Sequence, residues 1–438
     1  MESAPIPVQE LKSLQGSTMQ SDWEYVWESE NKSFTITKHK GDLSAYTGET
    51  SETLVVPSQV KCEDGKTYPV KALGTSGNEE RIAELADLYY KEQLDDDQWQ
   101  ELNNAWVFRF EEEIGGPNNI VISEGIETLY AGAILGSLVA FPTSIKRVEA
   151  FACAFNKFTE LNMANVRYVG RYAFMACLNL ETVNNISSEL VGLDYTTFEV
   201  CSALQNDNNL KDGAYYLGNE TNEYLLLIGL ADKNIVTFEN VDTQIVMANT
   251  FSNCTSLQSV SLPNVTIAGA GILSGCTSLQ SVNLSSVTSI ESEMFSGFVN
   301  LQTVNLASAI SIGDRAFANC TNLTDVTLAS VKTIGEYAFN ECLSLETIDI
   351  ATVETIGNYT FYYCSILKNV TLRDLKTIGE GVFDSCFHIV DSITRYAYIG
   401  YSENPYLVLL LWNTEPADCD KSLIKEGTKF ILAASIPY

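Results

Sequence analysis

The chain has 438 residues, of which 45% are hydrophobic, and its 56 acidic and 26 basic residues give a formal net charge of −30. Phosphate contacts need clustered Lys and Arg, so this balance argues against nucleic acid and anionic lipid as partners. No run of about 18 apolar residues occurs, so we expect no helix that inserts into a membrane.

The N-terminal part of the chain changes character twice. Residues 1–21 are polar and irregular, which predicts a flexible leader, and Met1 to Pro5 hold neither a basic nor an apolar signal region. An export signal has therefore either been removed or is not used. Residues 22–74 hold short apolar runs at 23–26, 34–37, 54–57 and 68–70, separated by turn formers. They predict a β-rich N-terminal cap that covers the open end of a repeat stack.

Residues 75–118 read as an acidic helical insertion. Ser76 and Glu79 have the spacing of a capping box, and apolar residues follow at helical spacing. A second helix start lies at Asp97, and residues 79–113 contain twelve acidic and three basic residues. We expect a solvated helical pair docked on the cap, with a partner-binding surface as the alternative.

The remaining chain divides by its repeats. Residues 119–184 hold the first leucine-rich repeats, 185–245 a β-hairpin insertion, 246–390 the regular repeats, and 391–438 a second hairpin copy with a C-terminal cap. The two insertions align around Gly218 and Gly400, where turn formers separate apolar runs. We expect the strand near residues 407–412 to cover the last coil, since a covered sheet edge prevents end-to-end association.

The regular repeats have a period of 22 residues from Phe251 to Phe383. A period of this size predicts a solenoid. Six of the seven repeats have a cysteine three residues after the position that Phe251 occupies. Leu273 replaces phenylalanine in the first register, and Phe298 replaces cysteine in the second. The registers therefore select apolar volume, and the predicted structural core includes Phe251, Phe295, Phe317, Phe339, Phe361, Phe383, Cys254, Cys320, Cys342, Cys364 and Cys386.

The cysteines of this register are expected to be reduced. Free Cys behaves as a small buried hydrophobe, and a bonded ladder could not accept Phe298 in place of a partner. We also expect neighbouring coils to splay on the cysteine side beyond the roughly 7 Å Cα separation that a disulfide tolerates.

Each repeat also contains an alternating segment, such as residues 279–284, which predicts a strand with Val282 and Leu284 facing inward. Stacked strands would form a parallel sheet, and the glycine that follows each return segment, such as Gly335, would permit a tight bend. The outward positions form a candidate binding face, although Ser and Thr there are also explained by solubility. They are Ser259, Ser261, Ser281, Asn283, Thr303, Asn305, Asp325, Thr327, Thr347, Asp349, Asn369 and Thr371.

Residues 334–348, together with their neighbours at the same spacing, resemble the BspA-like (Treponema pallidum-type) leucine-rich repeat family. The resemblance implies an α/β solenoid of leucine-rich-repeat type with about 22-residue coils. It also implies a protein that is surface-exposed or secreted, and some members are implicated in adhesion. The family implies no catalytic residues.

The sequence contains few residues that could form a catalytic site. The chain has two histidines, His39 and His388, which lie near opposite ends of the expected stack, so no nucleophile and base can meet across it. Cys386 is close to His388 but belongs to the buried register. No Cys/His spacing fits zinc and Asp95–Asp97 lacks the pattern of a calcium loop, so we expect no metal and no cofactor.

We therefore predict a non-enzymatic protein-binding protein, presented at a cell surface or secreted and involved in adhesion or host/cell interaction. Its partner would be a matrix or cell-surface protein. A cytoplasmic scaffold of the same fold is the alternative, favoured by reduced cysteines and by the missing signal. Glycan recognition by the polar strand face is a third hypothesis.

Overall fold

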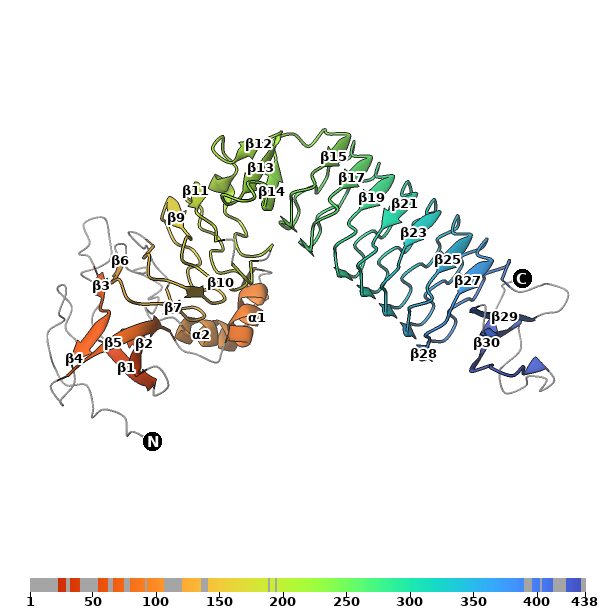
Figure 1. The fold of residues 1–438 in the computed structure, drawn as a ribbon, viewed down its shortest axis with the longest axis horizontal. Helices are drawn as coiled ribbons and strands as arrows, with labels where there is room; N and C mark the ends of the chain where they lie inside the picture. The colour runs from red at the N-terminus through yellow and green to blue at the C-terminus, as the bar shows by residue number, and fades with distance from the viewer. Residues whose placement is uncertain are drawn as a thin grey trace. The chain divides into compact units, whose positions relative to one another are not determined.

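The structure is a computed structural model, and it describes residues 23–28, 32–39, 54–61, 66–74, 79–90, 93–105, 120–134, 141–187, 190–193, 195–389, 396–401, 404–412 and 423–434. The chain divides into two compact units, Met1–Ile228 and Gly229–Tyr438, which we describe one at a time. Figure 1 shows the order of the elements in each.

The first unit begins with short strands that join the first coils in one sheet. Strand β1 (Trp23–Glu28) pairs antiparallel with β2 (Ser33–His39), which pairs parallel with β5 (Thr67–Leu73). The sheet continues through β7 (Thr128–Leu129), β8 (Arg147–Val148) and β10 (Tyr168–Val169). The β-rich segment is therefore hydrogen-bonded to the coils as well as packed on them.

The other strands of this unit are short. Strand β4 (Gln59–Lys61) pairs antiparallel with β5, and β3 (Leu54–Val56) pairs parallel with β6 (Ile120–Ile122). Further along, β9 (Glu160–Asn162) pairs parallel with β11 (Thr182–Asn184), and β12 (Leu210–Lys211) pairs antiparallel with β13 (Ala214–Leu217). Strand β14 (Leu226–Leu230) crosses the boundary between the units.

Two helices cover one side of the first coils. They are α1 (Glu79–Tyr90) and α2 (Asp96–Ala105). Asp95 caps α2: its Oδ1 accepts the Gln98 amide at 2.8 Å, and the Gln98 Oε1 accepts the Asp95 amide at 3.0 Å. The predicted cap of the first helix, at Ser76, lies outside the described residues.

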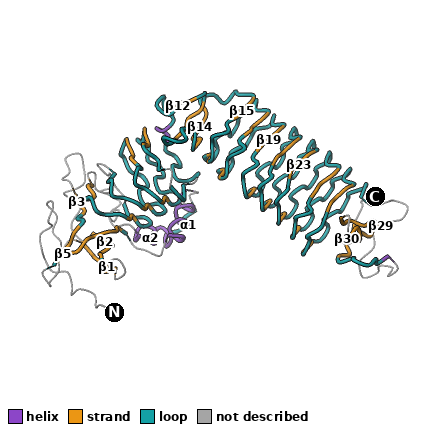
Figure 2. The backbone as a smooth tube through the Cα atoms, viewed as in Figure 1, coloured by secondary structure: helices purple, strands orange, loops and turns teal. Residues whose placement is uncertain are grey.

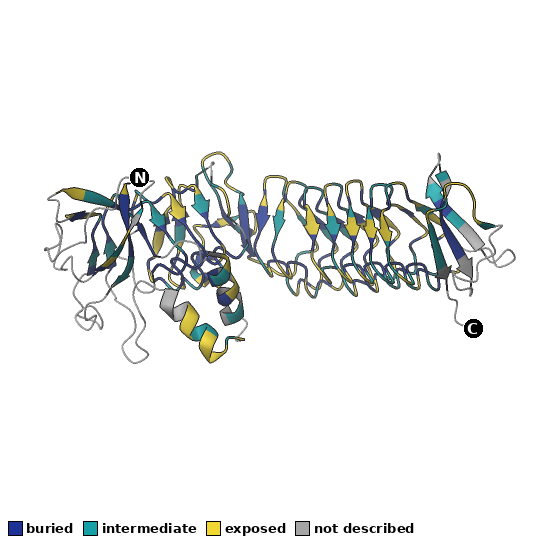
Figure 3. Cartoon of the chain, turned by 90° about the horizontal axis from the view of Figure 1, so that it is seen from below, coloured by how far each residue is buried: buried dark blue, intermediate teal, exposed yellow. Residues whose placement is uncertain are grey.

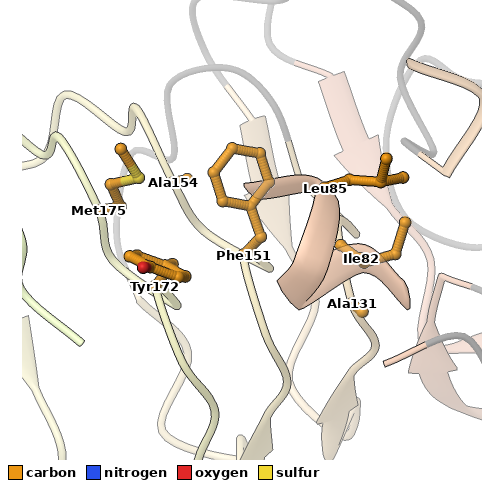
Figure 4. Close-up of a cluster of buried hydrophobic side chains, with 7 residues drawn as sticks. All are labelled: Ile82, Leu85, Ala131, Phe151, Ala154, Tyr172 and Met175. Atoms are coloured by element: carbon orange, nitrogen blue, oxygen red, sulfur yellow. The ribbon is translucent and has the colours of Figure 1, made fainter. Parts of the chain in front are cut away.

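The first helix packs on the coils. The sequence had predicted instead that it would pack on the N-terminal cap. Its buried Ile82 and Leu85 form one apolar cluster with Phe151, Tyr172 and other residues of successive coils (Figure 4). The physical reason is that these coils present aromatic side chains on their outer surface, which the helix covers. The sequence periodicity gave no indication of this aromatic surface.

The second unit contains the regular coils, and each coil contributes one three-residue strand to the same face. The odd-numbered strands from β15 to β23 pair in parallel and in register, and β25 pairs with β27 in the same way. In chain order they are β15 (Thr237–Glu239), β17 (Ser259–Ser261), β19 (Ser281–Asn283), β21 (Thr303–Asn305), β23 (Asp325–Thr327), β25 (Thr347–Asp349) and β27 (Asn369–Thr371).

Each coil also contributes a two-residue strand to a second parallel sheet, which the sequence analysis did not anticipate. Strand β16 (Ile245–Val246) pairs with β18 (Ile267–Ala268). A separate group follows, made of β20 (Ser289–Ile290), β22 (Ser311–Ile312), β24 (Thr333–Ile334), β26 (Thr355–Ile356) and β28 (Thr377–Ile378). The return path is therefore ordered by its own hydrogen bonds.

A hairpin follows the last regular coil. Strands β29 (Tyr396–Tyr401) and β30 (Asn404–Trp412) pair antiparallel, and β31 (Phe430–Ala434) pairs parallel with β30. The strand beside β27 is β29, which pairs with it through Gly400 and Thr371. The expectation that residues 407–412 cover the last coil is therefore wrong in detail, because their strand lies one position farther out.

The α/β label is not confirmed, although the 22-residue parallel solenoid is. Helices α1 and α2 both precede the coils, and the segments that carry the core phenylalanines are turns (Figure 2). Figure 3 shows that buried and exposed residues alternate along the coils. The core holds a stack of parallel rings from Phe295 to Phe383, with centroid separations of 4.9, 5.0, 5.4 and 5.6 Å.

The glycines of the return path have a different role from the one expected. Gly313, Gly335, Gly357 and Gly379 do not adopt a positive φ. Instead, a Cβ on Gly357 would lie 2.6 Å from the Glu336 amide nitrogen of the preceding coil. Close approach of neighbouring backbones therefore requires these glycines, and a tight bend does not.

Two neighbouring coils, those of β17 with β18 and of β19 with β20, are joined by strand pairing on only one side. Strands β17 and β19 pair in full, but β18 and β20 do not pair. Among the described backbone hydrogen bonds, the amides of Gly271, Leu273 and Gly275 donate none to the next coil, unlike the corresponding amides of the other regular coils. Glu291 stands here at the glycine position of the repeat. We attribute the open side to this larger residue, since a side chain does not fit a close backbone approach.

Candidate functional site

The twelve candidate residues of the strand face form two rows. In the first row Ser259, Ser281, Thr303 and Asp325 are direct neighbours on adjacent strands. The second row runs in the same way from Ser261 to Thr327. The described pairing stops between β23 and β25, and then Thr347 pairs with Asn369 and Asp349 with Thr371. The structure therefore brings the candidates together as groups of eight and four.

These side chains are accessible to different degrees. Five of them are half-buried, and the other seven are exposed; the half-buried five are Ser259, Ser261, Ser281, Asn283 and Asn305. Some also stabilise the coils: the Asn305 Oδ1 accepts the Ala307 amide at 3.3 Å, and the Asp349 Oδ1 accepts the Ala351 amide at 3.1 Å. The face is polar and weakly charged, and its side chains supply many hydrogen-bond donors and acceptors.

Ion pairs link neighbouring coils on both sheets. The Lys368 ammonium group forms an ion pair with Glu346, at the ends of adjacent strands. On the second sheet, Lys376 and Lys332 lie 2.5 and 3.6 Å from the Glu354 carboxylate, and the bond from Lys376 is the main reason that the pKa of Glu354 is lowered. Because these groups are exposed, each pair contributes little to stability.

The cysteine register is buried, free and hydrogen-bonded. All nine cysteines of the described residues are free. The expected splaying of the coils is wrong, because amides such as that of Phe339 donate to the next coil, here to the Thr360 carbonyl at 2.8 Å. The thiols of Cys320 and Cys364 each donate from Sγ, at 3.0 Å, to the carbonyl of the core phenylalanine 25 residues earlier. The register thus uses a weak polar contact in addition to volume.

Burial makes the thiols of Cys276 and Cys320 poor acids. Desolvation raises the pKa of Cys276 to about 11 and that of Cys320 to about 12. A thiolate is the reactive form of cysteine, so these groups are inert as nucleophiles near neutral pH.

Alkaline pH is therefore expected to destabilise the fold. The folded-state pKa is above the unfolded value, so the thiols contribute full stability below pH 9 and lose it as pH rises toward 11 to 12. Each such thiol should lower the free energy of unfolding by about 1.4 kcal/mol per pH unit in this window. Urea unfolding at pH 8, 9 and 10 measures the slope, and Cys320→Ala should reduce it. An unchanged slope in that variant would contradict the assignment.

The histidines and carboxylates of the described residues do not form a metal-binding cluster with the cysteines. His388 is exposed, and its Nδ1 lies 2.7 Å from the Ser365 carbonyl oxygen, while the His39 side chain lies outside the described part. In that part no group of three or more His, Cys, Asp or Glu side chains is placed to hold a metal ion. No helix among the described residues has the length and apolar character needed to span a bilayer.

The sequence analysis missed a second repeated surface, on the turns that carry the core phenylalanines. Two positions in these turns adopt a positive φ, for example 53° at Tyr337 and 57° at Glu341. Asn and Gly recur at the same positions, as at Asn319 and Gly297, and this enrichment was the available signal. We call the surface formed by these turns the turn side.

Comparison with known proteins identifies the repeat. The family described as BspA type leucine rich repeat region matches residues 118–221, 232–311 and 300–399, with six copies, which is more than half of the chain. The chain belongs to the BspA-type leucine-rich repeat family. The matched residues include the regular coils that carry the strand face. Proteins of this family are often found at cell surfaces.

Several solved structures of bacterial proteins, most of them described as leucine-rich repeat proteins, are similar to this one. A leucine-rich repeat protein of T. pallidum is 26% identical, with 40% of this chain and 89% of that chain covered and a TM-score of 0.33. One from Bacteroides ovatus is 18% identical, with coverages of 94% and 98% and a TM-score of 0.28. The pneumococcal vaccine antigen PcpA is 14% identical, with coverages of 82% and 98% and a TM-score of 0.37. No curated protein matches the chain.

Proposed function

We propose that this chain is a non-enzymatic protein-binding protein that acts at a cell surface or after secretion, in adhesion to a matrix or cell-surface protein. The observation that carries the proposal is the pair of in-register rows of short polar side chains on β17 to β23, with the same pairing repeated between β25 and β27. A repeat protein of the BspA type offers such a surface for protein interaction.

Two substitutions on the exposed part of this face test its role. Thr303→Glu with Thr347→Glu places two bulky negative charges among the rows, whereas Thr333→Glu places one on the second sheet as a control. Thr303, Thr347 and Thr333 are all exposed. We expect the double variant to lose about tenfold or more in affinity for immobilised matrix proteins, because a buried unpaired charge opposes binding. Equal binding by all variants would reject the strand face.

Location is tested separately by surface labelling of intact cells. A labelled pool on the outside is expected, and a wholly cytosolic pool would reject the adhesion proposal. That outcome would favour an intracellular scaffold, with which the nine free cysteines of the described residues agree. A glycan array tests recognition of sugars by the same donors and acceptors.

A further inference from the structure

The turn side of the coils already serves as a helix-docking surface in the first unit. There, Ile82 and Leu85 of α1 pack against Phe151, Ala154, Tyr172 and other residues of three successive coils (Figure 4). Phe151 and Tyr172 both occupy the first positive-φ position of their coils, with φ of 60° and 57°. Their rings project outward from the turn, which leaves an apolar surface that a helix can bury.

The same positions carry aromatic residues in the second unit. The coil-to-coil hydrogen bonds establish the correspondence, since Phe151 donates to the Arg171 carbonyl as Tyr359 donates to the Glu380 carbonyl. By this register Tyr359 corresponds to Phe151, Tyr362 to Ala154, and Tyr363 to Phe155. A surface that is buried under α1 in one unit is thus repeated in the other.

These aromatic residues form a partly exposed cluster, which we call the tyrosine patch: Tyr337, Tyr359, Tyr362, Tyr363, Ile366 and Phe387. Tyr363 and Phe387 are 38% and 37% exposed, and their ring centroids lie 6.0 Å apart in an edge-to-face arrangement. The Tyr337 and Tyr359 rings stack at 5.1 Å. Exposed tyrosine and phenylalanine grouped in this way are typical of interaction hot spots.

The size of the patch suits a short helix. A helix of 12 residues, the length of α1, is about 18 Å long at about 1.5 Å per residue. Coils spaced by about 4.8 Å let such a helix cross three or four of them. The tyrosine patch extends over three coils, those that contain Tyr337, Tyr359 and Phe387.

The charge around the patch specifies the polar face of the helix. The turn segments from Gly313 to His388 carry Asp314, Glu336, Glu341, Glu380 and Asp384, and their one basic residue is Arg315. Arg315 lies over the Tyr337 ring, 5.0 Å from its centroid. Glu380 adjoins the patch, because its carbonyl oxygen accepts the Tyr359 amide at 2.9 Å. The negative charge of its carboxylate is the main cause of a raised pKa at Tyr359.

We propose that the tyrosine patch binds an amphipathic helix of another protein, with apolar residues on one face and Lys or Arg on the other. The α1–α2 pair of a second copy is a poor candidate, because it carries seven acidic residues and one basic residue. The carboxylates around the patch would repel that pair and attract a basic helix. The proposal names one partner class for the proposed protein-binding function, at a surface separate from the strand face.

A matched pair of synthetic peptides tests this proposal. Both are 18-residue helices with leucine at positions i, i+3, i+4 and i+7, and their polar faces carry either Lys and Arg or Glu. Fluorescence anisotropy with the full chain should show saturable binding of the basic peptide. The acidic peptide should bind about tenfold more weakly or worse, by the cost of like charges. Equal binding of the two peptides, or no saturable binding of the basic one, overturns the proposal.

The chain itself supplies conservative replacements for the patch. Other coils have Asn319, Thr321 and Asn322 at the positions of Tyr363, Phe387 and Ile366. The triple variant Tyr363→Asn, Phe387→Thr, Ile366→Asn keeps every charge and should weaken the basic peptide about tenfold or more, the usual effect of removing a hot spot. Val299→Thr is the control, because Val299 is 47% exposed at the position of Phe387 but outside the patch. Unchanged affinity in the triple variant would show attraction by charge alone.

Two further measurements separate loss of binding from loss of folding and test the role of the carboxylates. Thermal unfolding checks that the triple variant is folded, and Glu380→Gln with Asp384→Asn removes charge without touching the rings. That double variant should reduce the dependence of affinity on salt; an unaltered dependence rejects the role of the carboxylates. The strand-face variants should bind the basic peptide normally, so failure of the strand face and failure of the tyrosine patch give different results.

Discussion

Replacing Phe339 by alanine is expected to lower the free energy of unfolding by about 3–5 kcal/mol, the range for removing a buried phenylalanine. Phe339 is fully buried, and its ring stacks between Phe317 and Phe361 at centroid distances of 5.0 and 5.4 Å. Its removal leaves a cavity between two rings that are fixed by their own coils, so little relaxation can fill it.

Phe387→Ala is the matched control for this variant. Phe387 is 37% exposed on the turn side of the last regular coil, so its loss should cost less than about 1 kcal/mol. Urea unfolding of both variants and of the parent measures the difference. A cost below about 1 kcal/mol for Phe339→Ala would show that the 22-residue aromatic register does not form the core.

Replacing Gly357 by alanine is expected to cost about 1–3 kcal/mol, the usual effect of forcing a group into a packed interior. The added Cβ would lie 2.6 Å from the Glu336 amide nitrogen and 2.7 Å from the Gly335 carbonyl carbon, both in backbone. Neither atom can rotate away as a side chain would, so the two coils must separate locally. The Gly357 amide, which now donates to the Ile334 carbonyl at 2.8 Å, should then exchange its hydrogen faster.

Glu291 supplies the control, because it stands at the same repeat position as Gly357 and already has a side chain. There β18 and β20 are unpaired among the described strands, so the coils have no close approach to lose. Glu291→Ala should change the free energy of unfolding by no more than about 0.5 kcal/mol. If the two substitutions cost the same, close backbone approach is not the reason for glycine in this register.

The repeat chemistry was predictable from sequence because it is local and periodic. A residue at a fixed position in each 22-residue coil meets the same neighbours in every copy, so Phe339 or Val282 can be assigned from spacing alone. The polar rows of the strand face follow from the same alternation. Leu273 and Phe298 also showed in advance that the registers select volume, although they could not reveal that the cysteine thiols donate to carbonyl groups.

Features that depend on distances between coils were not predictable in the same way. Sequence spacing does not state how closely two backbones approach, so Gly357 was explained by a bend and the second sheet was missed. The α/β class implied by the family resemblance is not confirmed either, because the segments that carry the core phenylalanines are turns without helix.

The sequence by itself determined the period, the buried registers and the residues available on the strand face, because each depends on contacts repeated at a constant separation along the chain. Only the tertiary structure decided that α1 packs on the turn side of the first coils and that the tyrosine patch repeats that surface in the second unit. The reason is physical: docking of α1 joins residues from 46 positions apart (Leu85 and Ala131) to 93 positions apart (Ile82 and Met175), and their contact depends on which side chains the turns direct outward. The 22-residue period does not determine which side chains the turns direct outward.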